Sequence, residues 1–312
     1  MQAQTSPPGA APNAAPGSQQ GPGGPGGPGG PGPGPAAAPE VDHSRECDSA
    51  CLRRHIEKYL QAYLRHDPSG LQINPTLRAS ENSVAVALGD NSWNTVKRMA
   101  AEKVILTDPF AGQVMVLGVV EMRGPEQFVF SLRLKIENNR ISESEIQTIS
   151  ERTGGVHFHP ELMAQSYAKL DAMVPAAQRA TREALLKSAR LAWGLDAGVA
   201  VSRTTDCLHY ENWESPDGGS GCRGAGRNPR NVRVPLVDVE KGVAVSYVME
   251  DFSSPQLGDG PPAEANMKLP LFYLQPTSLS IAKAAKFVDG KFATDVWLMQ
   301  TGEIGMMPVF RK

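Results

Sequence analysis

The sequence predicts an α+β protein built from two similar halves, and three observations support this fold class. A pattern centred on an aspartate recurs after 130 residues, an amphipathic helix opens each copy, and each copy closes with a hairpin signal. A helix followed by antiparallel strands is an α+β arrangement. Because a period of this length is too long for a solenoid, it indicates two copies of one domain.

The repeat rests on matches at a shared offset. The stretch 105–108, followed by Gly112, corresponds to 235–238, followed by Gly242. The same offset of 130 relates Glu81-Asn82 to Glu211-Asn212 and the helix end 62–63 to 192–193. Later, 135–141 matches 286–292 at an offset of 151, so about 21 extra residues are expected in the second copy, around 253–270.

In the first copy, apolar side chains recur at helical spacing over 52–64, and Pro68 stops this helix. The short segment 84–88 contains β-branched residues and predicts a strand. Residues 114–120 are apolar on both faces, as in a strand that is covered on both sides. Residues 128–136 alternate with period two, Asn138-Asn139 predicts a turn, and 141–149 is the last strand.

In the second copy, the helix is expected over 185–193, and Asp289-Gly290 predicts the hairpin turn before a last strand at 292–299. Residues 151–180 join the copies and look helical after Pro160. The predicted division is a tail at 1–43, a first domain at 44–150, a connector at 151–180 and a second domain at 181–312.

The N-terminal tail is expected to be a disordered spacer, because residues 1–40 hold 11 prolines and 11 glycines and no periodic apolar face. No signal peptide is present as written, and the small polar start is typical of a secreted protein after signal removal. The net charge of −2, without a basic cluster, argues against a nucleic-acid partner. No apolar run is long enough to span a membrane.

Four cysteines permit three complete pairings. A bridge between Cys207 and Cys222 would close a loop rich in Gly, Ser and Pro, whereas Cys47 and Cys51 lie one helical turn apart. Free thiols and a metal site that includes His55 are the alternatives, and the metal site lacks a full ligand set. Disulfides would place the protein in an oxidising compartment, periplasmic or secreted.

These motifs together resemble the nuclear transport factor 2-like (SnoaL-like) superfamily. The helix, the Glu-Asn pair, the aspartate before a Gly-x-Val strand and the final hairpin carry the resemblance over most of 44–300. The opening Cys47 to Leu52 before a Tyr-Leu-x-Ala helix is similar to a bacterial and fungal two-domain group of exported proteins with no assigned activity. The resemblance implies two tandem cystatin-like α+β cones, each with an apolar pocket, and enzymes that need no metal or organic cofactor.

The richest candidate site is His209-Tyr210-Glu211 in the second copy. On a strand, His209 and Glu211 share one face and Tyr210 points to the other. A His–Glu pair in an apolar cone can serve as a general base near neutral pH, and a rim location without catalysis is the alternative. Further residues predicted to line the pocket, with core packing as the other interpretation, are Tyr247, Trp297, Trp193, Tyr273 and Asp238.

Other polar motifs have simpler interpretations. Asp108 and Asp238 each precede a Gly-containing turn and are expected to bond their own backbone. His157 and His159 lie in the connector, and no further spaced histidine completes a metal site. No phosphate-binding loop, dinucleotide fingerprint or serine nucleophile elbow occurs.

The sequence therefore predicts an exported protein that binds a small apolar or aromatic molecule, as a monomer or homodimer and without cofactors. If it is catalytic, a cofactor-free lyase, dehydratase or isomerase is expected, with His209 and Glu211 as the base pair and Tyr210 or Tyr247 as donors to an oxyanion. The alternative is a non-catalytic module in which the two cones form a pseudo-dimer.

Overall fold

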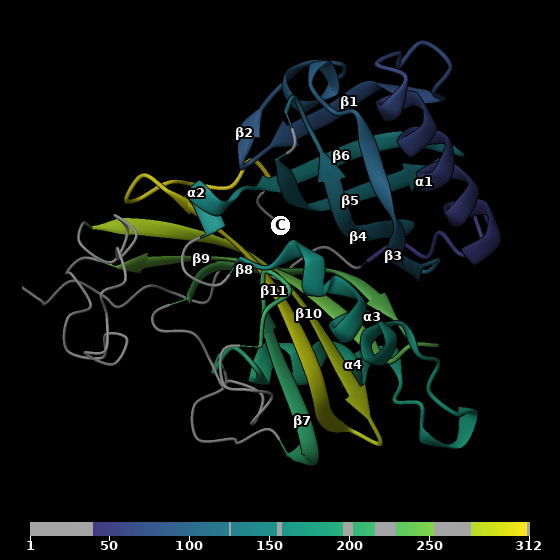
Figure 1. Ribbon diagram of the computed structural model, residues 1–312. Helices are drawn as coiled ribbons and strands as arrows, with labels where there is room; N and C mark the ends of the chain where they lie inside the picture. The colour runs from purple at the N-terminus through teal and green to yellow at the C-terminus, as the bar shows by residue number, and fades with distance from the viewer. Residues whose placement is uncertain are drawn as a thin grey trace, which may run out of the picture. The chain divides into compact units, whose positions relative to one another are not determined.

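Two mostly antiparallel β-sheets, each preceded by a helix, make up the described part of the chain (Figure 1). The computed structural model describes residues 40–124, 126–154, 158–195, 202–215, 229–252 and 276–310. All of these belong to one compact unit, residues 40–312. The two sheets account for most of the regular structure, so the α+β class expected from the sequence is confirmed.

The first half begins with helix α1 (Ser49–Leu64), whose first turn is capped by Asp48, which accepts a hydrogen bond from the Cys51 N–H at 2.8 Å. The six-stranded sheet has the order β2-β1-β6-β5-β4-β3. Its strands are β1 (Ile73–Glu81), β2 (Val84–Ala85), β3 (Arg98–Asp108), β4 (Gln113–Glu121), β5 (Gln127–Glu137) and β6 (Arg140–Ile149).

The second half begins with helix α4 (Arg182–Leu191), capped by Thr181, and its five-stranded sheet has the order β7-β11-β10-β9-β8. Its strands are β7 (Arg203–Glu211), β8 (Pro229–Asp238), β9 (Val243–Phe252), β10 (Thr277–Val288) and β11 (Lys291–Gly302). Apart from β2, the strand order is that of the first sheet. In both halves the first strand pairs parallel to the last, β1 with β6 and β7 with β11, and the other pairs are antiparallel.

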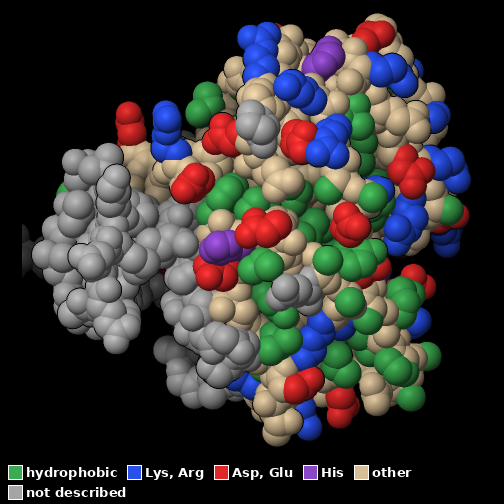
Figure 2. Space-filling view, in the orientation of Figure 1, with side chains coloured by type: hydrophobic (Ala, Val, Ile, Leu, Met, Phe, Trp, Pro, Cys, Tyr) green, Lys and Arg blue, Asp and Glu red, His purple; other side chains and the backbone are tan. Residues whose placement is uncertain are grey.

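The connector contains the short helix α2 (Glu151–Gly154) and helix α3 (Met163–Asp171), so the helix expected after Pro160 is confirmed. Three short 3₁₀ helices complete the described elements: η1 (Asn91–Asn94), η2 (Pro160–Leu162) and η3 (Ala176–Gln178). Within the described residues, no helix combines the length and apolar character needed to cross a membrane. On the face seen in Figure 2, basic and acidic side chains are interspersed.

Strand β4 is buried on both faces, as its sequence predicted. Val114, Val116 and Val120 pack in a core with α1, whereas Met115, Leu117 and Val119 face the opposite way. The second group belongs to a core that also contains residues of β7 to β11, including Leu236, Val245 and Val296. One side of each sheet therefore packs on its own half, and the other side contributes to a core shared by both halves.

The repeated aspartates join the halves by a reciprocal exchange of hydrogen bonds. Asp108 Oδ2 accepts from the Val237 N–H at 2.8 Å, and Asp238 Oδ2 accepts from the Thr107 N–H at 3.0 Å. The other carboxylate oxygen of each bonds the turn that follows it, at Ala111 N and Lys241 N. The expected turn role is thus confirmed, and each side chain also bonds the other half.

One predicted strand is wrong. The chain at 84–88 forms only the two-residue strand β2, and Val84 is 59% exposed. The longer strand of this region is β1, which precedes it. Its sequence has Asn74 and Pro75 and no period-two apolar pattern, so the sequence gives no strand signal there. The strand lies near the edge of the sheet, between β2 and β6, and pairs parallel with β6. The antiparallel expectation therefore fails for β1 and for β7.

The turn and cysteine predictions fare better. Asn138, Asn139, Asp289 and Gly290 all have positive φ, as tight hairpin turns require. Cys47 and Cys51 form a disulfide. Cys207 has no free thiol, and its predicted partner Cys222 lies outside the described residues, as do the tail at 1–39 and the predicted insertion at 253–270.

Candidate functional site

Strand pairing places the candidate histidine beside a carboxylate that the sequence analysis did not select. Strands β7 and β11 run parallel, with His209 opposite Asp295 and Glu211 opposite Trp297. Because side chains alternate along a strand, His209 and Glu211 lie on one face of β7. The same face of β11 carries Asp295 and Trp297.

His209 bridges two carboxylates. Its Nδ1 lies 2.9 Å from Asp295 Oδ1 and its Nε2 lies 2.9 Å from Glu211 Oε1. His209 is only 1% exposed and Asp295 is fully buried. Asp295 also accepts a hydrogen bond from the indole N–H of Trp297 through Oδ2. The carboxylate of Asp295 is therefore the centre of a buried polar network.

A buried lysine completes this network. Lys283 on β10 lies opposite Trp297 on β11, and its Nζ is 3.3 Å from Asp295 Oδ2. The same ammonium lies over the rings of Trp193, Phe292 and Trp297, at 4.8, 5.0 and 5.1 Å from their centroids. Aromatic faces are attractive surfaces for a desolvated cation. We call His209, Glu211, Lys283 and Asp295 the buried network.

The charges of the network set its protonation. Burial disfavours the imidazolium, yet the hydrogen bonds that its ring N–H groups donate to Asp295 and Glu211 outweigh burial and raise the pKa of His209 to about 9. Burial lowers the pKa of Lys283 below its ordinary value. Burial acts to raise the pKa of Asp295, but the charges of Lys283 and His209 prevail and lower it. His209 thus carries its proton at neutral pH.

The first half has the same strand register but different chemistry. There Ala79 lies opposite Ser144, in the positions that His209 and Asp295 occupy in the second half. Leu132 lies opposite Ile146, as Lys283 lies opposite Trp297. The fourth member of the network, Glu211, corresponds to Glu81. Glu81 is therefore the only charged side chain among the four corresponding positions of the first half. Three of the four members of the buried network are therefore particular to the second half.

The retained carboxylate in the first half has neutral partners. Glu81 Oε2 accepts hydrogen bonds from the Ser92 N–H at 3.2 Å and from the Ser92 hydroxyl at 2.7 Å. Burial raises the pKa of Glu81. Nearby, the Tyr59 hydroxyl bonds Ser144 at 2.7 Å, and Trp93 packs edge-on against Tyr59. In the first half, the region that corresponds to the buried network is therefore filled by neutral and aromatic side chains.

The structure brings together some of the predicted site residues and separates others. Trp193 and Trp297 pack on each other with centroids 5.2 Å apart, and Trp297 also contacts His209 edge-on at 5.2 Å. Tyr210 and Tyr247 lie in the core shared by the two halves, on the opposite face of the second sheet. Asp238 lies in the reciprocal exchange with the first half. Tyr273 lies outside the described residues.

Sequence reasoning missed Lys283 and Asp295, although a signal for both was available. At the offset of 151, they correspond to Leu132 and Ser144. A charged residue at the position of a buried uncharged one marks a departure from the pattern that the two copies share. The repeat was used to define the fold, whereas the differences between its copies locate the site.

One small cavity of the described residues lies on the other face of the second sheet. A cavity of about 10 Å³ lies near Tyr247, and Ser83, Glu145, Arg233 and Ser280 are among its lining residues. This volume suffices for about one water molecule. It is on the Tyr247 face, away from the buried network. Around Lys283, the rings of Trp193, Phe292 and Trp297 are the immediate neighbours.

Comparison with known proteins gives limited information. No family model matches the chain, and no curated protein matches it. A de novo designed protein with a curved β-sheet is 14% identical and has a TM-score of 0.24, with 32% of this chain and 87% of that chain covered. AclR, a candidate hydroxylase from Streptomyces galilaeus, is 16% identical and has a TM-score of 0.22, with 41% and 91% covered. Neither match decides a family.

Proposed function

We propose that the chain is an exported pair of NTF2-like cones, and that the second cone binds a small apolar or aromatic molecule beside the buried network. The observation that carries this proposal is the chemical difference between two halves of equal strand order. The first half forms its sheet with Ala79, Leu132 and Ser144 where the second half has His209, Lys283 and Asp295. The network is thus an addition to the fold.

Energetics supports a functional interpretation of this difference. Buried charges lose hydration, and their replacement by well-packed apolar residues is often neutral or stabilising by about 1–4 kcal/mol. Lys283 and Asp295 are fully buried, so they bear this cost in full. Clustered ionisable groups with shifted pKa values that the fold does not require are typical of functional sites. The first half forms the same strand order without three of these four groups, so the fold itself does not require them.

The aromatic residues indicate the class of ligand. Trp193 and Trp297 present ring faces beside the charges of Lys283 and His209. A flat apolar molecule with one polar substituent can stack on a ring and bond a charged group. Because these rings lie against the lysine in the present state, a ligand must displace at least one of them. We assign this movement to Trp193, which follows α4 rather than belonging to the sheet.

If the site is catalytic, we propose cofactor-free proton transfer of the lyase, dehydratase or isomerase type. The proton that His209 holds at neutral pH favours a donor role for the imidazolium, with Glu211 as the carboxylate that accepts a proton. The ammonium of Lys283 would stabilise negative charge that develops on a ligand oxygen. Asp295 would position both cations, because it contacts each of them.

A thermal-shift screen against small aromatic, terpenoid and polyketide-like compounds tests the binding proposal. A ligand at a hundred times its dissociation constant adds about 2.7 kcal/mol to stability, which is readily detected. The decisive variant is Lys283→Leu combined with Asp295→Ser, which installs the first-half residues and leaves net charge unchanged. The matched control is Ser144→Ala in the first half. The ligand-induced thermal shift should be lost in the double variant and kept in the control. A thermal shift that persists in the double variant, or that is also lost in the control, would contradict the proposal.

The alternative, a non-catalytic module that is a pseudo-dimer of cones, also has specific support. The halves share a buried core, and Asp108 and Asp238 each accept a hydrogen bond from a backbone N–H of the other half, at Val237 and Thr107. The cavity near Tyr247 holds only about one water molecule. This function predicts no stabilising compound in the screen. It also predicts that the buried network stabilises the fold, so that the Lys283→Leu and Asp295→Ser double variant is less stable than the wild-type protein.

A further inference from the structure

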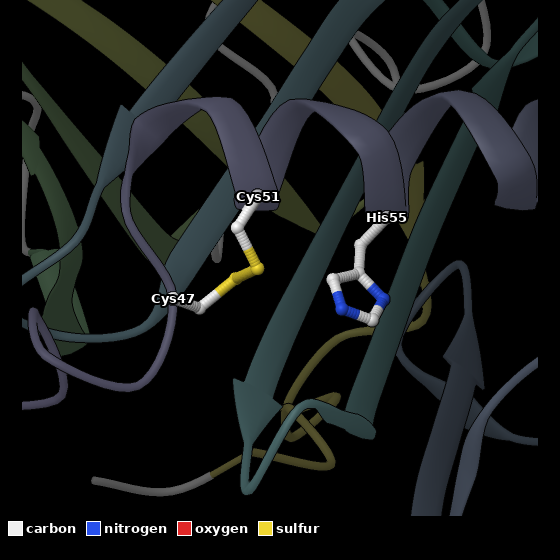
Figure 3. Close-up of side chains that lie close together, drawn as sticks. All are labelled: Cys47, Cys51 and His55. Atoms are coloured by element: carbon white, nitrogen blue, oxygen red, sulfur yellow. A yellow bond between two sulfur atoms is a disulfide. The ribbon is translucent and has the colours of Figure 1, made fainter.

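Among the described residues outside the buried network, a cluster of side chains of metal-ligating type lies at the start of the first half. Cys47, Cys51 and His55 each have a potential ligand atom, and these atoms all lie within 4.8 Å of one another. Figure 3 shows the two sulfurs joined as a disulfide, with the His55 ring one turn further along α1. In this oxidised state the sulfurs are bonded to each other. The cluster therefore has two chemically distinct states.

We infer that reduction of the Cys47–Cys51 disulfide converts this cluster into a Zn²⁺ site with Cys47, Cys51 and His55 as ligands. A dithiol reductant would supply two electrons and two protons, become a disulfide itself, and leave two thiols. Binding of Zn²⁺ would then release both thiol protons and form two Zn–S bonds and one Zn–N bond. The ligand set Cys₂His is one that zinc binds in tetrahedral geometry.

The distances suit this assignment. Tetrahedral zinc with bonds of about 2.3 Å to sulfur and about 2.0 Å to nitrogen needs sulfurs about 3.8 Å apart and a sulfur-to-nitrogen separation of about 3.6 Å. The two sulfurs, now bonded to each other, would move apart to reach this separation, and the His55 nitrogen, now within 4.8 Å of both, would approach by about 1 Å. Cys51 and His55 are fixed on α1 at i and i+4, whereas Cys47 precedes the helix. Cys47 can thus move without breaking a helical hydrogen bond of α1.

A fourth donor is already in place. Asn139, in the hairpin between β5 and β6, has its Oδ1 2.8 Å from His55 Nε2 and 3.7 Å from Cys51 Sγ. This oxygen can fill the remaining coordination position or hold the imidazole in the ligand orientation. Thiolate and imidazole ligands favour Zn²⁺ over Mg²⁺ and Ca²⁺, which prefer oxygen. The site thus distinguishes the class of cation as well as the redox state.

Cobalt titration of the full chain tests this inference, because Co²⁺ substitutes for Zn²⁺ and gives a thiolate charge-transfer band. The reduced protein is expected to bind one Co²⁺ per chain that Zn²⁺ displaces, and the oxidised protein is expected to show no band. The Cys47→Ser and Cys51→Ser double variant should lose the band, and His55→Ala should weaken binding at least tenfold. His159→Ala, whose side chain is in the connector, is the matched control and should bind as the wild type does.

A second measurement needs no variant and covers the case in which one of them fails to fold. Zn²⁺ added to the reduced wild-type protein should protect Cys47 and Cys51 from alkylation, as read by mass spectrometry, while Mg²⁺ should not. Equal alkylation with and without Zn²⁺ would overturn the inference. So would a cobalt band that persists in the double cysteine variant, or His55→Ala binding that equals the wild type.

Discussion

The ionisation of His209 makes a quantitative prediction about stability. The hydrogen bonds that its ring donates to Asp295 and Glu211 overcome burial and raise its pKa from 6.5 to about 9. Because the folded protein binds this proton more tightly than the unfolded chain, the contribution is fully present below pH 6.5 and is lost as pH rises toward 9. At about 1.4 kcal/mol per pKa unit, the full contribution is about 3 kcal/mol, and about 2 kcal/mol of it disappears between pH 7 and pH 9.

The assay is urea unfolding of the wild-type protein and of His209→Gln at several pH values between 6 and 9. Lys286 titrates in an overlapping range, because burial lowers its pKa to about 8. Its folded pKa lies below its unfolded value, so it makes stability rise with pH above about 8. This contribution is present in both proteins and cancels in their difference. The difference in unfolding free energy should therefore shrink by about 2 kcal/mol from pH 7 to pH 9.

The imidazole resonances provide a direct check, since the signal absent from His209→Gln identifies the residue. Its titration midpoint should lie near 9 in the folded protein. A midpoint at or below 6.5, or wild-type and variant stabilities that run parallel across this pH range, would refute the reasoning about the buried network. In that case the donor role proposed for His209 would also be abandoned.

Three further predictions concern the fold. Gly242→Ala should destabilise by about 2–4 kcal/mol in urea unfolding, because its φ is +64° and a Cβ would meet the Phe287 carbonyl oxygen at 2.4 Å. Gly290→Ala also has a positive φ but open space around the Cβ, so it should lose only about 1 kcal/mol, and equal losses in the two variants would contradict this reasoning. Asp108→Asn should destabilise by about 2–4 kcal/mol in urea unfolding, and by more than Asp238→Asn, because Asp108 also accepts a hydrogen bond from the partly buried Arg182. A larger loss for Asp238→Asn would contradict this. Cys47→Ser should lower stability by about 2 kcal/mol in thermal unfolding under oxidising conditions, and unchanged stability would argue against the cross-link as a stabilising element.

The parts of the fold that sequence reasoning predicted well are those with a local physical signature. The helix α1 has an apolar stripe at helical spacing, β4 is apolar on both faces, and the Asn138-Asn139 turn has residues that tolerate positive φ. Each of these can be recognised within about ten residues. The strand β1 has no such signature, because parallel pairing with β6, more than 60 residues away, holds it in place.

The same distinction explains why the candidate site was only half predicted. His209 and Glu211 are two residues apart on one strand, so their shared face follows from the sequence. Asp295 and Lys283 reach them only through the register of β7, β11 and β10, which joins segments more than 70 residues apart. Tyr210 and Tyr247 were selected for their chemistry, but alternation along β7 and β9 turns both toward the core shared by the two halves.

A duplicated fold offers an internal control that a single domain lacks. In the two halves, positions with equal register experience similar strand geometry, so a residue required by the fold should have the same character in both. Asp108 and Asp238 meet this test, and their reciprocal hydrogen bonds give the structural reason. His209, Lys283 and Asp295 fail it, because their counterparts are small or apolar. Because the equivalent positions of the first half do without these charges, we propose that the asymmetry reflects a ligand or reaction confined to the second half.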